Sequence, residues 1–387
     1  MLLVVVAVVS GSIGWVLGTR SSLEDPAGPS ASVDDMSEDS GQGDQSPAAP
    51  DQADTSSVAG TGDEDAAVAA ARRFIDTYVD PDGRVVRRDQ GNDTVSEGQA
   101  YALLLAAAIG DDATVDRVWA WSAANLQRPD GLLAWHHDGN VVLDDESAPD
   151  AEVDAIRGLL LASDISGDAR DQAAGRMMDA LAERLVVASP ASVGSVLSPG
   201  EWAIDRQISN PSYFSPRTVE LLADLEPDGP WRELLVGSRA ELDTLTESGH
   251  RLPPDWSSWT EGAAIPVGGP SGDGRPQFSW DAARVPIRLA ESCDPVDRGL
   301  AAGWFPTLRT RPEAIVRGLD GEVLTNDEHP VALVAAAASA HAAGDTASRD
   351  QLLDDAERLE QQRPSYYGAA WVALGRVLLQ TDFAGSC

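Results

Sequence analysis

Lysine is absent from this 387-residue sequence, so all 28 of its basic residues are arginines. They stand against 63 acidic residues, which gives a formal net charge of -35 at pH 7. Long-range repulsion from this charge works against nucleic acid and other anionic polymers as partners. A neutral or cationic ligand is therefore favoured.

Cysteine and histidine are also scarce. The two cysteines, Cys293 and Cys387, stand far apart, and the five histidines show no spacing typical of a metal site. We therefore expect neither a bound metal nor a cofactor. The two cysteines can pair if the protein is exported, and two unpaired thiols are an equally good interpretation.

Long apolar runs are lacking except at the start of the chain. Residues 1–18 are almost uninterruptedly apolar, which is close to the shortest length that spans a membrane. The basic n-region and small-residue cleavage site of a signal peptide are not evident. We expect residues 1–20 to form an N-terminal transmembrane anchor, with a cleaved signal as the alternative. Either segment exports the rest of the chain, which then faces the outside or is secreted.

The composition changes twice after this segment. Residues 21–65 are rich in Ser, Asp, Pro, Gly and Ala and nearly free of aromatic and β-branched residues, which predicts a disordered acidic linker. Residues 66–387 then form one folded domain.

Strand signals are scarce in this domain, where Ala- and Leu-rich segments are separated by Gly, Pro and Asp. We expect close to twelve helices, over 65–78, 96–109, 113–126, 150–163, 167–187, 215–225, 231–246, 281–290, 295–310, 329–343, 346–362 and 366–380. Six hairpin pairs of helices would make an all-α (α/α)6 barrel. An open α-solenoid is the alternative, but no repeat of fixed period appears.

Tryptophan is frequent, with eleven residues against five Phe and five Tyr. Several of them stand in or beside loop segments, including Trp135, Trp202 and Trp280. A single tryptophan of this kind more often anchors a loop. The set as a whole favours a carbohydrate-binding cleft.

Glu97 stands at the start of a predicted helix, in D-T-V-S-E-G-Q-A-Y-A-L-L-L-A at 93–106. We expect Ser96 to be the N-cap of this helix, with Gln99 completing a capping box. Glu97 is then either a functional carboxylate or a first-turn acid that only complements the helix dipole.

Two further acids stand in comparable contexts. Asp150 follows Ser-Ala-Pro at a predicted helix cap, and Asp281 lies in F-S-W-D-A-A-R, three residues before Arg284. Arg284 can pair with Asp281 and keep it ionised, which suits a general base. The alternative is an ordinary ion pair on a helix.

Six motifs occur in order along the domain: T-V-S-E-G-Q-A-Y at 94–101, G-L-L-A-W at 131–135, L-D-D-E-S-A-P-D-A-E at 143–152, N-P-S-Y-F-S-P at 210–216, P-P-D-W at 253–256 and W-D-A-A-R-V-P at 280–286. This set resembles glycoside hydrolase family 8. The family contains bacterial endoglucanases, including those linked to cellulose synthesis, together with licheninases, chitosanases and xylanases. The resemblance runs from about Glu64 to the C-terminus.

The resemblance implies an (α/α)6 barrel and an inverting, endo-acting hydrolysis of β-1,4 links in a cellulose-like glucan. It implies that Glu97 is the general acid and Asp281 the general base. Asp150 would lie between them and hold the distorted sugar.

Other positions are implied to contact the substrate. Tyr213 and Arg284 match residues that orient the water, the base or the sugar. Trp135 is a stacking platform by its motif, Trp202 is one by composition only, and Gln99 is a further expected contact. The likeness to cellulose-synthesis enzymes also implies a polysaccharide synthase as a partner, and we expect a monomer.

Two positions depart from the cellulase-type pattern, which has Thr or Ser where Pro149 stands and Asp where Glu152 stands. They leave the substrate open, so chitosan, mixed-linkage glucan and xylan remain alternatives. A non-catalytic glycan-binding protein of the same fold is the alternative from another class, and a polysaccharide lyase is a weaker third.

Overall fold

The computed structural model describes residues 60–163, 168–260, 262–385 and 387. The predicted anchor at 1–20 and most of the predicted linker at 21–65 lie outside these residues. The last part of that linker is helical, because the first helix, α1, already begins at Gly60. Among the residues described, none of the helices has the length and apolar character needed to cross a membrane.

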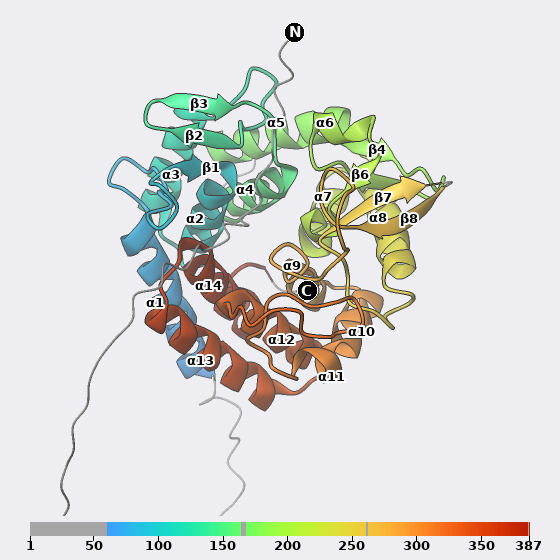
Figure 1. The fold of residues 1–387 in the computed structure, drawn as a ribbon. Coiled ribbons are helices and arrows are strands. Elements are labelled where there is room, and N and C mark those ends of the chain that lie inside the picture. Colours follow the sequence, from blue (N-terminus) through green and yellow to red (C-terminus); the bar gives the residue numbers. More distant parts are fainter. Residues whose placement is uncertain (1–59, 164–167, 261, 386) are drawn as a thin grey trace, which may run out of the picture. The chain divides into compact units, whose positions relative to one another are not determined.

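Helices alternate along the chain between an outer and an inner ring (Figure 1). The outer ring contains α1 (Gly60–Tyr78), α3 (Asp112–Asn125), α5 (Ala169–Arg184), α8 (Trp231–Leu245), α10 (Pro295–Gly303) and α13 (Thr346–Gln362). The inner ring contains α2 (Ser96–Ala108), α4 (Pro149–Leu161), α7 (Pro216–Leu225), α9 (Arg284–Ala290), α12 (Pro330–Ala342) and α14 (Tyr366–Gln380). Each inner helix packs against its two inner neighbours, and α14 closes the ring against α2. This arrangement confirms the predicted (α/α)6 barrel.

The inner helices are apolar on nearly all sides because other helices surround them. In α2 and α12 almost every residue is buried. Gly158 lets α4 approach α2 closely, since a Cβ at this position would lie 2.9 Å from the backbone of Leu103 and Leu104. The helix that carries Glu97 and the helix that carries Asp150 are therefore held in direct backbone contact.

Short strands at the ends of the helices were missed by the sequence analysis. Antiparallel pairing joins β1 (Thr94–Val95), β2 (His136–Asp138) and β3 (Val141–Asp144), then β4 (Val186–Ala188) and β5 (Ser195–Leu197), and finally β6 (Ile208–Ser209), β7 (Trp256–Thr260) and β8 (Ala263–Val267). Strands of two to five residues give too little alternation to recognise. They hold the loops that carry the motifs, as where Val95 pairs with His136.

The remaining elements are short. They are α6 (Glu201–Ile204), the 3-10 helix η2 (Pro211–Tyr213) and α11 (Phe305–Leu308). The single helix predicted over 295–310 is in fact α10 followed by α11, because the first ends at Gly303 and the second has Pro306 in its first turn.

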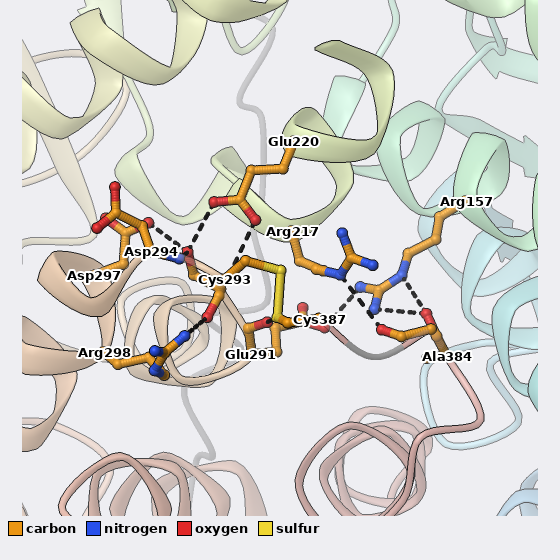
Figure 2. The surroundings of a disulfide bond; sticks show 12 residues. Arg157, Arg217, Glu220, Glu291, Cys293, Asp294, Asp297, Arg298, Ala384 and Cys387 are labelled. Atoms are coloured by element: carbon orange, nitrogen blue, oxygen red, sulfur yellow. Dashed lines mark hydrogen bonds and ion pairs between the residues drawn. A yellow bond between two sulfur atoms is a disulfide. The ribbon is translucent and has the colours of Figure 1, made fainter. Parts of the chain in front are cut away.

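A disulfide bond joins Cys293 to Cys387, with a Cα–Cα distance of 5.4 Å (Figure 2). The C-terminus lies inside the ring beside α9 (Figure 1). Arg157 of α4 donates hydrogen bonds of 3.2 and 2.9 Å from Nε and Nη2 to the carbonyl oxygen of Ala384. The pairing that the sequence left open is therefore formed and holds Cys387 next to the end of α9, while Arg157 holds Ala384 against α4.

Candidate active site

Arg284, the first residue of α9, lies at the centre of a cluster of carboxylates. Its Nη1 donates to Oε1 of Glu97 at 2.8 Å and to Oδ2 of Asp150 at 2.7 Å, and its Nη2 donates to Oδ1 of Asp281 at 2.8 Å. The arginine side chain is 3% exposed. The three acids singled out in the sequence, which span 97 to 281, are thus brought together around one buried cation.

The inner ring explains why these acids meet. Glu97 and Asp150 lie in the first turns of α2 and α4, and Asp281 lies in the turn that leads into α9. The N-terminal ends of three inner helices therefore point to the same end of the barrel. Helix N-termini favour negative charge, so this end is suited to hold carboxylates.

Glu97 is the most accessible of the three acids, with a side chain 24% exposed. Its Oε1 accepts a hydrogen bond of 2.6 Å from the hydroxyl of Tyr101, one helical turn further on. The expected capping arrangement is wrong, because α2 begins at Ser96 itself, and Val95 is the N-cap without a side-chain hydrogen bond. The backbone is held instead by a hydrogen bond of 2.9 Å from the Ser96 amide to the carbonyl of Trp135.

Burial dominates the ionisation of the other two acids. It raises the pKa of Asp150 to about 7, against the opposing effect of Arg284, while the charge of Glu97 raises this pKa further. Burial likewise raises the pKa of Asp281, and Arg284, Asn210 and Trp256 act in the opposite direction. Asp150 can therefore hold a proton near neutral pH inside the cluster.

Tyr213 and Ser212 complete the surroundings of Arg284 from the 3-10 helix η2. The guanidinium lies 5.3 Å from the centre of the Tyr213 ring, and its Nη2 donates to Oγ of Ser212 at 2.7 Å. Burial raises the pKa of the Tyr213 hydroxyl well above its usual range, so this tyrosine stays protonated.

Trp135 precedes β2 and Trp202 lies in the short helix α6, and both side chains are partly exposed. The ring of Trp135 stacks on His136 at a centroid distance of 4.7 Å, just before β2. The ring centroids of Trp202 and Trp256 lie 6.2 Å apart, and the Trp256 side chain forms a hydrogen bond with Asp281. Trp135 thus lies next to the first turn of α2 through its backbone, and Trp202 lies beside Trp256, the neighbour of Asp281.

Gln99 lies elsewhere than expected. Its side chain is completely buried, accepts a hydrogen bond of 2.5 Å from the Val85 amide, and donates at 2.8 Å to Oγ of Ser122 and at 3.1 Å to the carbonyl of Gly83. A side chain without accessible surface cannot contact a polysaccharide. Gln99 instead ties α2 to α3 and to the loop after α1.

Glu152, one of the two departures from the cellulase-type pattern, is also fully buried. Its Oε1 accepts a hydrogen bond of 2.8 Å from the Leu133 amide, and burial raises its pKa to about 8. A neutral Glu152 therefore links the first turn of α4 to the loop that carries Trp135.

Sequence reasoning missed several contributors to the cluster. Tyr101, Ser212 and Asp255 all contact the acids, the arginine or the turn that carries Asp281. Tyr101 and Ser212 stand within the quoted motifs, and Asp255 is the acid of P-P-D-W. Their presence in these motifs was the one available signal. In the described part of the chain, no group of His, Cys, Asp and Glu side chains is arranged to hold a metal ion.

Comparisons with known proteins give a family match. The family model described as Glycosyl hydrolases family 8 matches residues 57–377. An endoglucanase of Xanthomonas axonopodis pv. citri is 33% identical over 200 residues, which cover 48% of this chain and 51% of that protein. A probable endoglucanase of Novacetimonas hansenii is 32% identical over 231 residues, which cover 55% of this chain and 64% of that protein. The chain thus spans about half to two thirds of the length of these curated relatives.

Solved structures give the same result for the fold. An endo-β-1,4-glucanase from Acetobacter xylinum is 26% identical with a TM-score of 0.67, and the match covers 81% of this chain and 98% of that one. A β-1,3-1,4-glucanase from Paenibacillus is 17% identical with a TM-score of 0.71, covers 84% of this chain and 93% of that one, and shows the fold alone. With the family match extending over most of the barrel, the chain belongs to glycosyl hydrolases family 8.

Proposed function

We propose that the protein is an inverting, endo-acting glycoside hydrolase that cleaves β-1,4 links in a cellulose-like glucan. The observation that carries this proposal is the bridging of Glu97, Asp150 and Asp281 by the single buried Arg284. Relatives named as endoglucanases and the family match support the choice of substrate class.

In the proposed reaction Glu97 is the general acid and Asp281 the general base. Glu97 gives its proton to the glycosidic oxygen while the bond from that oxygen to the anomeric carbon breaks. Asp281 removes a proton from a water molecule, which attacks the anomeric carbon from the opposite face. The new hydroxyl therefore has the inverted configuration.

The contacts to Arg284 are compatible with this mechanism. Because Glu97 and Asp281 are each 2.8 Å from nitrogens of one planar guanidinium, their bound oxygens lie within roughly 8 Å of each other. Inverting enzymes place the two carboxyl groups about 6.5–9.5 Å apart to leave room for the water. The upper limit of roughly 8 Å between the bound oxygens of Glu97 and Asp281 falls within this range.

Asp150 and the aromatic residues have supporting roles in the proposal. Asp150 shares Arg284 with both catalytic acids, so it can hold the sugar between them and supply a protonated carboxyl near neutral pH. Tyr213 orients the arginine, while the partly exposed indoles of Trp135 and Trp202 bind sugar rings.

Substitution of the two catalytic acids tests this proposal. We expect Glu97→Gln and Asp281→Asn each to lower the release of reducing ends from carboxymethylcellulose by at least about a thousandfold, while the fold is retained. Glu183→Gln and Asp179→Asn are matched controls, because both acids are exposed on the outer helix α5. Full activity in either catalytic variant would overturn the assignment.

The alternatives are separated by substrate and product. A panel of cellulose oligosaccharides, mixed-linkage glucan, xylan and chitosan identifies the glycan, and NMR of the first product anomer identifies the stereochemistry. Chitosan stays in the panel because the strongly negative chain also suits a cationic polymer. Binding without cleavage of any member would favour the non-catalytic glycan-binding protein.

We further propose that the protein is exported and held at the cell membrane by residues 1–20, facing outside. The disulfide between Cys293 and Cys387 supports export, because such bonds persist in oxidising compartments. Protease digestion of intact cells tests this, since an internal protein would stay protected. The synthase partner and the monomeric state stay predictions.

A further inference from the structure

Asp255 is a buried acid beside the turn that carries Asp281, and the proposed mechanism gives it no role. It precedes β7 and is 8% exposed. Its Oδ1 accepts hydrogen bonds of 2.9 Å from the backbone amides of Ser279 and Ala282, and its Oδ2 accepts from the hydroxyl of Ser279. All three donors flank Asp281.

Asp255 also donates a hydrogen bond to the segment that carries Asp281. The backbone amide of Asp255 donates at 2.9 Å to the carbonyl of Gln277, just before the turn. The side chain of the next residue, Trp256, forms a hydrogen bond with the Asp281 carboxyl, which opposes the rise of its pKa. The segment 277–282 is therefore held by the segment 255–256 through both main chain and side chains.

Other contacts also hold this turn, since the hydroxyl of Tyr367 donates at 3.1 Å to the carbonyl of Trp280 and the amide of Arg284 donates at 3.0 Å to the carbonyl of Asp281. Residues 280–283 precede the seven-residue helix α9, whose first amides have no partners within the helix. Asp255 accepts hydrogen bonds from two amides of the turn before this helix, those of Ser279 and Ala282. Because Asp281 lies between the two amides, these bonds hold the backbone from which its side chain extends, while Arg284 binds the carboxylate itself.

A buried carboxylate is a costly choice for this position. Burial raises the pKa of Asp255 to about 7, and the nearby charge of Asp281 adds to the rise. The protein caps other turns with acids in far more accessible places, as Asp345 does before α13. The free-energy cost of burying the Asp255 carboxylate is explained if the turn 279–282 must be held accurately in place.

We propose that Asp255 is a positioning residue for Asp281, holding the turn 279–282 so that the carboxylate of Asp281 is presented to the water it activates. This inference rests on the proposed function, in which Asp281 is the general base. Asp255 itself touches neither substrate nor water in the reaction.

The variants Asp255→Ala and Asp255→Asn test the proposal on the whole protein. Alanine removes all three hydrogen bonds, and we expect kcat to fall at least tenfold, toward about a hundredfold, with KM changed less than about threefold. Asparagine keeps the acceptor for both amides and can donate to the Ser279 hydroxyl, so we expect it to restore kcat to within about threefold of wild type.

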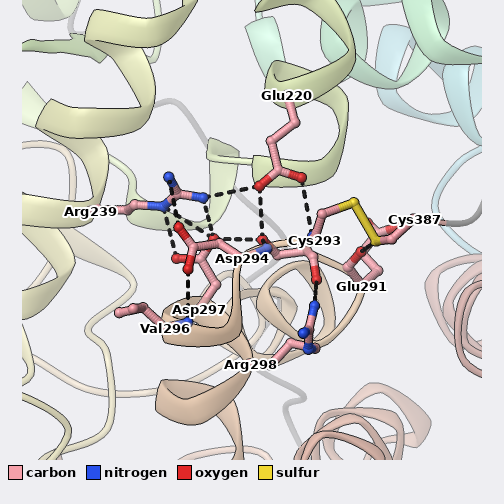
Figure 3. A network of polar contacts seen from close by, with 10 residues as sticks. Glu220, Arg239, Glu291, Cys293, Asp294, Val296, Asp297, Arg298 and Cys387 are labelled. Carbon is pink, nitrogen blue, oxygen red and sulfur yellow. Dashed lines mark hydrogen bonds and ion pairs between the residues drawn. A yellow bond between two sulfur atoms is a disulfide. The ribbon is translucent and has the colours of Figure 1, made fainter.

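A matched control lies at the other end of α9. Asp297 (Figure 3) is 3% exposed, and its Oδ2 accepts a hydrogen bond of 2.6 Å from the hydroxyl of Ser292, as Asp255 accepts one from the hydroxyl of Ser279. Asp297→Ala therefore removes a comparable buried acid that supports the helix but not the turn of Asp281. We expect it to lower the melting temperature and to leave kcat within about twofold of wild type on the folded protein.

Three results overturn the proposal. These are a wild-type kcat in folded Asp255→Ala, equal losses of kcat in Asp255→Ala and Asp297→Ala, and no recovery in Asp255→Asn. If Asp255→Ala does not fold, Ser279→Ala removes only the hydroxyl donor. It should lower kcat about threefold or more at constant KM, and an unchanged kcat would equally refute the role.

The failure of the proposed function has a different signature. An active Asp281→Asn variant would show that Asp281 is not the base, whatever Asp255 does. An inactive Asp281→Asn with a fully active Asp255→Ala would leave the function standing and remove the positioning role.

Discussion

Nη1 of Arg284 lies 2.7 Å from Oδ2 of Asp150, and the same nitrogen also holds Glu97. Nη1 of the planar guanidinium thus donates to two acids on the neighbouring helices α2 and α4, while Nη2 donates to Asp281. A lysine carries the same charge on a single ammonium nitrogen, which cannot bridge the three carboxylates in this geometry.

We therefore expect Arg284→Lys to lower kcat by about a hundredfold or more, because the three acids lose their common orientation. Steady-state kinetics on a soluble glucan, with circular dichroism to verify folding, measures this. Arg73→Lys is the control, since Arg73 forms an exposed pair with Glu357 on the outer helices. A lysine variant with wild-type kcat would show that bridging is not required.

The stability of the protein should fall as pH rises from about 5 to 8. Burial raises the pKa of Glu152 to about 8 from its ordinary value of 4.5, so in this window the folded state keeps a proton that the unfolded state has lost. Each such group lowers the free energy of unfolding by up to about 1.4 kcal/mol per pH unit. Asp150, Glu241 and Asp255 contribute with the same sign.

Glu152→Gln isolates one of these groups. Glutamine keeps the acceptor for the Leu133 amide but cannot ionise. Urea denaturation at pH 5, 6, 7 and 8 should give a shallower decline than wild type and a more stable variant at pH 8. Parallel curves for the two proteins would contradict the assignment of the raised pKa to Glu152.

Removing the disulfide should destabilise the barrel without changing its chemistry. The bond closes a loop with a sequence separation of 94, so the double variant Cys293→Ser and Cys387→Ser is expected to lose about 2–4 kcal/mol. Thermal denaturation with and without a reducing agent measures this. The reductant should lower the melting temperature of wild type and leave that of the double variant unchanged, and an equal effect on both proteins would refute the explanation.

Gln99 separates a structural role from a substrate contact. We expect Gln99→Leu to destabilise the fold by about 2 kcal/mol or more, because the buried Val85 amide loses its acceptor. On the folded fraction KM should stay at the wild-type value. Trp135→Ala is the comparison variant, and there KM should rise severalfold at nearly wild-type stability. A raised KM in Gln99→Leu would restore the substrate-contact interpretation.

The sequence predicted the barrel well because its helices are long and clearly bounded. The predicted helices at 346–362 and 366–380 coincide with α13 and α14, where Ser365 caps the second and Asp345 the first. The three acids were found through motifs. Their common arginine could be anticipated only as a partner of Asp281, since the contacts to Glu97 and Asp150 depend on how inner helices are placed in space.

The sequence alone did not show which polar side chains are buried. Gln99 stands beside Glu97 and seemed equally suited to a ligand, yet two positions along a helix are about 200° apart in direction, so it points into the core. Asp255 carried no local signal of its role because its partners, Ser279 and Ala282, lie more than 20 residues later. Pairings of this kind belong to the tertiary structure.

The way in which the ring closes has a consequence for the order of synthesis. Nε2 of Gln380, at the end of α14, donates at 3.4 Å to Oδ1 of Asp63, near the start of α1. A ribosome makes α1 and α2 first, yet the helix that covers them is made last. Until then the apolar faces of both helices stay uncovered, so the nascent chain passes through a long aggregation-sensitive interval before the barrel can be completed.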